Sequence, residues 1–221
     1  MREMKSVNRM KMDIRTIIYL VLLVCILSVS AYSLKIGSIR IYEFMFFVIG
    51  SIIFIIWNLK DRIKSIKDNI KSVVETAEKA EKAGEWKKAL QAYDELVTAR
   101  PNHFKSIIRR AECIKHLNGY REAMHEFKLI IEQFPKEAEA HFMLGICYFE
   151  GRLTEEAMDC FETALNLDPK FVEVYPYMGD IHKLNRNIDK ALEYYEIYIQ
   201  KGSDKKTVKA VEKKIQGIKK Q

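Results

Sequence analysis

The sequence predicts an all-α protein: a two-helix transmembrane hairpin, an α-solenoid of four helix-turn-helix repeats and a C-terminal capping helix. Two long uncharged runs lie before residue 60, a 34-residue pattern of large and small residues fills 70–205, and a narrow apolar stripe among lysines follows. The chain of 221 residues is long enough for one domain of about 100 to 200 residues preceded by a membrane anchor.

The two uncharged runs predict the anchor. Thr16 to Leu34 contains 19 consecutive uncharged residues, and Phe44 to Leu59 contains 16. Each run is close to the roughly 20 residues with which a helix crosses a hydrocarbon core. We therefore expect a basic cytoplasmic leader at 1–15 and transmembrane helices at 16–34 and 41–59.

The distribution of basic residues predicts the orientation. Five Lys or Arg precede the first run and five follow the second, whereas the loop between them has only Lys35 and Arg40. The side richer in Lys and Arg stays cytoplasmic, so we expect an integral membrane protein with both termini in the cytoplasm. Membrane lipids are then expected partners, through the two spans and the basic flanks. Alternatively the first run is a cleaved signal peptide, because Ser28 and Ser30 form a small-x-small site after an apolar core.

A helical connector is expected at 60–69, because no Pro or Gly interrupts the chain between Leu59 and Gly84. Apolar residues line one face of this helix with alternating spacings of four and three: Leu59, Ile63, Ile66, Ile70, Val73, Ala77 and Ala80. One interpretation is a short coiled coil that pairs two copies into a homo-oligomer. The interpretation that we favour is an amphipathic connector that runs into the first repeat, because the stripe ends in alanines.

Four frames of 34 residues follow without insertion, at 70–103, 104–137, 138–171 and 172–205. A small residue recurs in the first helix of each frame, at Ala77, Ala111, Gly145 and Gly179. A small residue and an aromatic residue recur in the second helix, at Ala89 and Tyr93, Ala123 and Phe127, Ala157 and Phe161, and Ala191 and Tyr195. Proline ends the first three frames at Pro101, Pro135 and Pro169. This pattern predicts helix pairs that cross at the small residues, with the aromatic ring beside the crossing.

The third frame resembles the tetratricopeptide repeat most fully. The matching residues are His141, Leu144, Gly145, Tyr148, Ala157, Phe161, Ala164 and Pro169, with His141 in place of the usual Trp. The fourth frame departs from the pattern, because Ser203 replaces the terminal proline and Pro176 lies in the first helix. A proline there is tolerated only in the first turn.

The last segment, 206–221, is expected to be a basic capping helix. Val208, Val211, Ile215 and Ile218 fall on one face and lysines on the others. A repeat array must cover the apolar side of its last repeat, and such a helix does so. The alternative is a basic helix on a membrane surface, which the narrow stripe and the lack of Trp or Phe disfavour.

The net charge of +7 does not indicate a nucleic-acid partner. Residues 1–69 carry 11 basic and 5 acidic residues and 206–221 carry 6 and 1, but 70–205 carry 20 and 24, so the repeat body is mildly acidic. No phosphate loop, nucleophile motif or metal-ligand spacing is present, and the five histidines fall at unrelated positions in their repeats. We therefore expect no enzyme activity, no cofactor and no metal. Cys113 and Cys147 occupy equivalent positions, which indicates buried, reduced thiols.

The resemblance implies that the array binds a protein or peptide partner in a concave groove lined by the first helix of each repeat. The residues carried over to this groove are Lys71, Val74, Glu78, Lys105, Ile108, Glu112, Lys115, Phe142, Ile146, Phe149, Pro176, Asp180 and Lys183. Its centre is apolar, and Lys105 and Lys115 would flank it as cations. The expected function is a membrane-anchored scaffold or adaptor that binds its partner at the cytoplasmic membrane surface. The alternatives are an assembly subunit that acts through its transmembrane helices or self-association, and an accessory regulator of a membrane enzyme.

Overall fold

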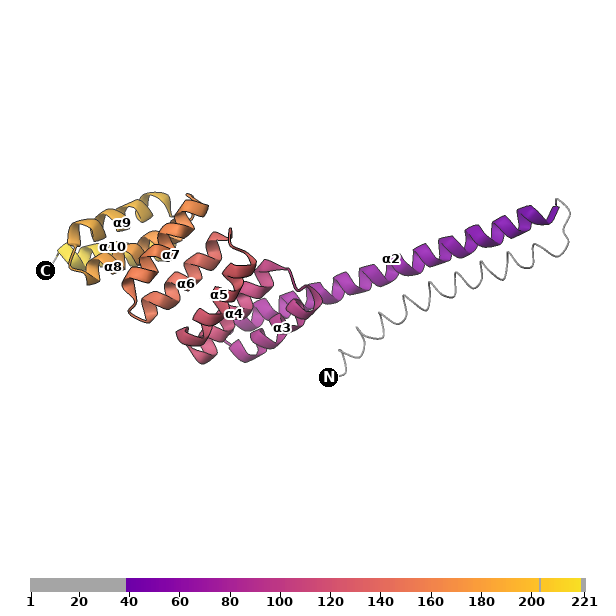
Figure 1. The fold of residues 1–221 in the computed structure, drawn as a ribbon, viewed down its shortest axis with the longest axis horizontal. Coiled ribbons are helices and arrows are strands. Elements are labelled where there is room, and N and C mark those ends of the chain that lie inside the picture. The colour runs from indigo at the N-terminus through magenta and orange to yellow at the C-terminus, as the bar shows by residue number, and fades with distance from the viewer. Residues whose placement is uncertain (1–38, 203, 220–221) are drawn as a thin grey trace. The chain divides into compact units, whose positions relative to one another are not determined.

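The computed structural model describes residues 39–202 and 204–219, and every regular element in these ranges is a helix (Figure 1). The helices form successive antiparallel pairs after the first long helix, which is the expected α-solenoid. The elements are α2 (Ile39–Lys82), α3 (Trp86–Ala99), α4 (Phe104–Asn118), α5 (Tyr120–Gln133), α6 (Ala138–Glu150), α7 (Thr154–Leu167), the 3-10 turn η1 (Val172–Val174), α8 (Tyr175–Leu184), α9 (Ile188–Lys201) and α10 (Lys205–Lys219).

The described residues provide no transmembrane helix. The chain divides into two units, 1–65 and 66–221, and within residues 39–202 and 204–219 no helix is sufficiently long and apolar to cross a membrane.

The predicted localisation, an integral membrane protein with two spans and both termini cytoplasmic, is therefore wrong. The prediction that the second span, at 41–59, contacts membrane lipids is therefore not supported. The leader at 1–15 and the first predicted span at 16–34 lie outside the described residues.

The helix α2 continues without interruption through the predicted connector at 60–69 into the first repeat. Ala77 and Ala80 are buried, and they pack with Ala89, Ala92 and Tyr93 of α3. This end of the apolar stripe therefore belongs to the core of the first repeat and is not free to pair two copies. Ile63 and Ile66, earlier on the same stripe, are exposed.

The crossing of the two helices in each repeat depends on its small residue. A Cβ atom added to Gly145 would lie 2.5 Å from Cε1 of Phe161, and one added to Gly179 would lie 2.5 Å from Cε1 of Tyr195. Real Cβ atoms essentially never approach so closely, so the aromatic ring occupies the space that a side chain would need. Phe161 and Tyr195 are both fully buried.

Aromatic residues at the two ends of the array carry a hydroxyl group, and those in the middle do not. Tyr93 donates a hydrogen bond of 3.0 Å to Glu81, and Tyr195 donates one of 2.6 Å to Oδ1 of Asp180. The corresponding residues of the two middle repeats are Phe127 and Phe161. A buried tyrosine requires a partner for its hydroxyl, and each end repeat supplies a carboxylate from its own first helix.

Proline has the predicted positions. Pro101, Pro135 and Pro169 are exposed and lie between one repeat and the next. Pro176 lies in the first turn of α8, directly after η1, where its missing N–H group costs nothing. The fourth repeat therefore tolerates the proline that departs from the repeat pattern.

The helix α10 packs against α9 through the predicted apolar stripe. Val211 and Ile215 are 1% and 8% exposed, and they form one cluster with Ala191, Tyr195 and Tyr198. Val208 and Ile218 are partly buried at the edge of this cluster. The apolar side of the last repeat is thereby covered.

Two buried thiols predict how stability depends on pH. Cys113 and Cys147 are fully buried, and burial raises the pKa of each thiol from 9.0 to about 12. The folded state holds these protons more tightly than the unfolded chain, so the stabilisation is complete below pH 9 and is lost as the pH rises towards 12. We expect the free energy of unfolding to fall by about 2 kcal/mol for each thiol between pH 9 and pH 11, and so by about 4 kcal/mol for the two together.

Urea denaturation at a series of pH values, under reducing conditions, would measure this loss. The matched control is the Cys113→Ala, Cys147→Ala double variant, whose free energy of unfolding should depend less steeply on pH in this interval. Equal slopes for the two proteins would contradict the assignment to the thiols.

Candidate partner-binding groove

An aromatic cluster forms the floor of the groove at the third and fourth repeats. The ring of Phe142 on α6 lies 5.1 Å from that of Phe171 and 5.5 Å from that of Tyr177, both in edge-on geometry. It also lies 5.9 Å from the buried ring of Phe161. Phe149 extends the cluster, with its ring 6.0 Å from that of Tyr177. Each such pair is worth about 0.5–1.5 kcal/mol beyond the burial of its area, so the floor is held rigidly.

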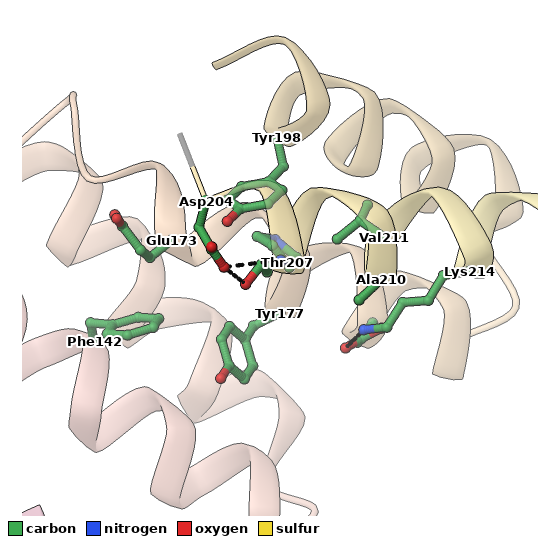
Figure 2. A pocket seen from close by; sticks show the side chains of 11 residues that line it. Phe142, Glu173, Tyr177, Tyr198, Asp204, Thr207, Ala210, Val211 and Lys214 are labelled. Carbon is green, nitrogen blue, oxygen red and sulfur yellow. Dashed lines mark hydrogen bonds and ion pairs between the residues drawn. The ribbon is translucent and has the colours of Figure 1, made fainter. Parts of the chain in front are cut away.

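A cavity of about 400 Å³ lies above this floor, between the first helices of the repeats and α10. Figure 2 shows the rings of Phe142 and Tyr177 on one side of the cavity and residues of α10 on the other. Its size is within the range of sites that hold small ligands or single anchor side chains. The residues that line it are Phe142, Glu173, Pro176, Tyr177, Asp180, Tyr198, Asp204, Thr207, Ala210, Val211 and Lys214.

An ion pair joins α10 to α8 at one end of the cavity. Nζ of Lys214 lies 2.7 Å from Oδ1 and 2.6 Å from Oδ2 of Asp180, which also accepts the hydrogen bond from Tyr195. The charge of Asp180 is thus compensated within the protein. Both side chains are partly exposed, so the pair contributes about 1 kcal/mol or less to stability and mainly fixes the position of α10.

The opposite end of the cavity is acidic. Asp204 accepts hydrogen bonds from the hydroxyl of Thr207 and from the backbone N–H groups of Thr207 and Lys206, at the start of α10. These bonds hold the pKa of Asp204 below its ordinary value, so this carboxylate stays ionised. Burial, together with the charges of Asp204 and Glu173, raises the pKa of Tyr198. Glu173 and Asp204 therefore act on the same region of the cavity.

The structure separates the predicted groove residues into three groups. Phe142, Pro176 and Asp180 line the cavity, and Phe149 lies beside it in the aromatic cluster. Ile108 and Ile146 are buried in the core instead, with exposures of 0% and 7%. The remaining predicted residues are the exposed Lys71, Glu78, Lys105 and Lys183, the partly buried Val74, and Glu112 and Lys115.

Lys115 and Glu112 are both engaged in ion pairs. Nζ of Lys115 lies 2.8 Å from Oε1 of Glu150, and Oε2 of Glu112 lies 2.7 Å from a guanidinium nitrogen of Arg109. Burial raises the pKa of Glu112 above its ordinary value, and Arg109 opposes this rise. The predicted cation at Lys115 is therefore neutralised by its neighbour.

The sequence interpretation missed Glu173, Tyr177 and the whole wall contributed by α10. The sequence did contain a signal for Glu173. The second position of the four successive frames is occupied by Lys71, Lys105, Glu139 and Glu173, so its charge changes from positive to negative. The wall could not be found in this way, because α10 lies outside the repeat frame. Within residues 39–202 and 204–219, no group of three or more His, Cys, Asp or Glu side chains could hold a metal ion.

Comparison with known proteins supports the repeat assignment. Residues 138–171 match the family model of the tetratricopeptide repeat, the same segment on which the resemblance was recognised. No match was found among curated proteins.

Solved structures share the fold. The crystal structure of YrrB, a TPR protein with an unusual peptide-binding site, is 16% identical, with 71% of this chain and 88% of YrrB covered and a TM-score of 0.51. Residues 41 to the end of MamA from Desulfovibrio magneticus RS-1 are 20% identical, with 66% and 84% covered and a TM-score of 0.50. These similarities show that the chain is an all-α solenoid of TPR-like repeats.

Proposed function

We propose that this chain is a non-catalytic scaffold that binds a peptide segment of a partner protein in its concave groove. The observation that carries the proposal is the cavity between α6, α8 and α10, with its aromatic floor of Phe142 and Tyr177. A rigid aromatic floor in a concave site suits an aliphatic or aromatic anchor side chain. YrrB, a TPR protein with an unusual peptide-binding site, has a similar fold, and this analogy supports a peptide ligand.

The part of the predicted groove between repeats three and four is the best candidate for the contact. Ile108 and Ile146 are buried and cannot supply an exposed apolar surface, whereas Phe142 and Tyr177 are only partly buried. Ala210, on the wall opposite, is exposed and small. A ligand side chain therefore has room between Ala210 and the aromatic floor.

Ala210→Trp is expected to weaken peptide binding by at least tenfold, because the indole ring would occupy the space of the anchor. Peptides would first be selected from a random display library on the full-length chain, and their affinities would then be measured by isothermal titration calorimetry. Ala210 is exposed, so the substitution can be made without disturbing the core; Phe142→Glu would place a charge against the buried ring of Phe161.

Gln216→Trp is the matched control, since Gln216 is exposed on the same helix and does not line the cavity. It should retain the wild-type affinity. Failure to select any peptide, or equal affinity of the Ala210→Trp and Gln216→Trp variants, would refute binding in this cavity.

A further inference from the structure

The sign of the charge at one position of the repeat frame reverses along the array. At the second position of the repeat frame, the first two repeats carry Lys71 and Lys105, and the last two carry Glu139 and Glu173. Glu173 is exposed and lines the cavity. The cavity therefore lies in the acidic half of the groove.

Two of the carboxylates that line the cavity are not in ion pairs, although the charge of Lys206 acts on Asp204. Among the described residues neither Glu173 nor Asp204 forms an ion pair, whereas Asp180 is paired with Lys214. Three carboxylates and one ammonium group line the cavity, so the groups in its lining have a net charge of −2. Both side chains are exposed at the rim and can meet charges on a ligand.

The shape of the site adds an apolar requirement. The floor consists of the rings of Phe142 and Tyr177, and Pro176, Ala210 and Val211 also line the cavity. An apolar side chain seated there would place the neighbouring residues of its peptide at the rim. A cation on such a residue would face carboxylates, and a phosphate or carboxylate would be repelled.

We propose that the cavity is selective for a basic peptide of another protein, in which an aliphatic or aromatic anchor is flanked by Lys or Arg. This inference rests on the proposed function, because it assigns the chemistry of the peptide that the groove binds. Arginine is the best flanking residue, since its planar guanidinium can bond a carboxylate through two N–H groups. The selectivity opposes the expectation from sequence that cations of the groove would flank the site.

Three fluorescein-labelled peptides test the inference on the full-length chain. All three contain the same leucine–tryptophan anchor, flanked by lysine and arginine, by serine and glycine, or by aspartate and glutamate. Fluorescence anisotropy is expected to show the basic peptide binding about tenfold more tightly than the neutral one, and the acidic peptide more weakly still. The preference should shrink as the salt concentration rises.

The Glu173→Gln, Asp204→Asn double variant removes both charges with little change in shape. Asparagine can still accept the hydrogen bonds that cap α10, so the fold should be retained. This variant is expected to bind the basic and neutral peptides with similar affinity. The matched control is Glu155→Gln, Glu156→Gln, which removes two exposed carboxylates of α7 that do not line the cavity, and it should keep the tenfold preference.

The outcomes separate the two proposals. Equal affinity of wild type for the basic and neutral peptides would overturn the charge selectivity and leave peptide binding intact. Binding of none of the three peptides would overturn the selectivity, while peptides selected from the display library could still support the proposed function. A dimer that Ala210→Trp dissociates, without binding of any peptide, would assign the cavity to a second copy and overturn both.

Discussion

Replacing Gly145 with leucine is expected to lower the free energy of unfolding by about 3 kcal/mol, near the upper end of the cost of overpacking a core. Leucine has a higher intrinsic helix propensity than glycine by several tenths of a kcal/mol, so a helix in isolation would gain. Here the new Cβ atom would lie 2.5 Å from the ring of Phe161, which is itself fully buried and cannot move into solvent. The steric cost therefore exceeds the gain in helix propensity, and urea denaturation followed by circular dichroism would measure the difference.

Gly217→Leu is the control for this prediction. Gly217 lies in α10, and a Cβ atom added there meets no atom within 4 Å. Its stability should equal or exceed that of wild type. A second test is to combine Gly145→Leu with Phe161→Ala, since the leucine would occupy part of the space left by the ring. The double variant should be more stable than the sum of the single effects predicts, by about 1–3 kcal/mol; strict additivity would show that the two positions do not share this space.

The second prediction concerns α10. Val211→Asp would place a carboxylate at a site that is 1% exposed. The buried residues of the cluster around this site, which include Tyr195 and Tyr198, carry no cation. Burying such a charge costs more than the docking of α10 provides, since burial of Val211 and Ile215 is worth about 2 kcal/mol each. We expect α10 to detach, and peptide binding to fall at least as far as in Ala210→Trp, because the wall of the cavity leaves with it.

Hydrogen exchange would show the detachment directly, as a loss of protection in α10 and at the end of α9. Gln216→Asp introduces the same side chain at an exposed position of the same helix and should change protection and affinity little. Protected amides in α10 of the Val211→Asp variant would mean that the helix is held by contacts other than this apolar stripe. Retained peptide binding after the loss of α10 would show that the cavity wall is not required.

The sequence was sufficient to predict the repeats because their packing depends on local spacing. A small residue in the first helix and an aromatic residue 16 positions later recur in all four frames, as at Ala111 and Phe127, and in the structure Phe127 is fully buried. The same reasoning identified Val211 and Ile215 as the inward face of the last helix. In each case the helical spacing alone indicates which side chains face a neighbouring helix.

The groove was predicted less well. The spacing of residues along a helix shows on which face a side chain lies, but it does not show how far a neighbouring helix buries that side chain. Ile108 falls at a groove position and is 0% exposed. Lys115 falls at another, and its charge is met by Glu150, which follows 35 residues later in the chain. An ion pair between residues so far apart in the chain depends on how successive repeats stack. The residue pattern within one repeat does not contain that information.

The second membrane span, at 41–59, was mispredicted for a related reason. Counting uncharged residues identified the run from Phe44 to Leu59, but this run is part of α2, which continues into the charged residues after it. No helix among the described residues is long and apolar enough to cross a membrane. The basic residues that follow this run lie on α2, and those before residue 16 lie outside the described residues. The acidic residue at the cavity, by contrast, could have been predicted from the sequence, because Glu173 occupies the second position of the fourth frame.

The wall formed by α10 determines when the cavity is complete during synthesis. On the ribosome each repeat can pair its two helices as soon as both have emerged, so most of the solenoid is complete before α10 has been made. The cavity has no second wall until that helix folds back and Lys214 reaches Asp180, 34 residues earlier in the chain. A nascent array therefore presents only its aromatic floor, and the cavity that we propose as the binding site is complete only after the whole of α10 has left the ribosome.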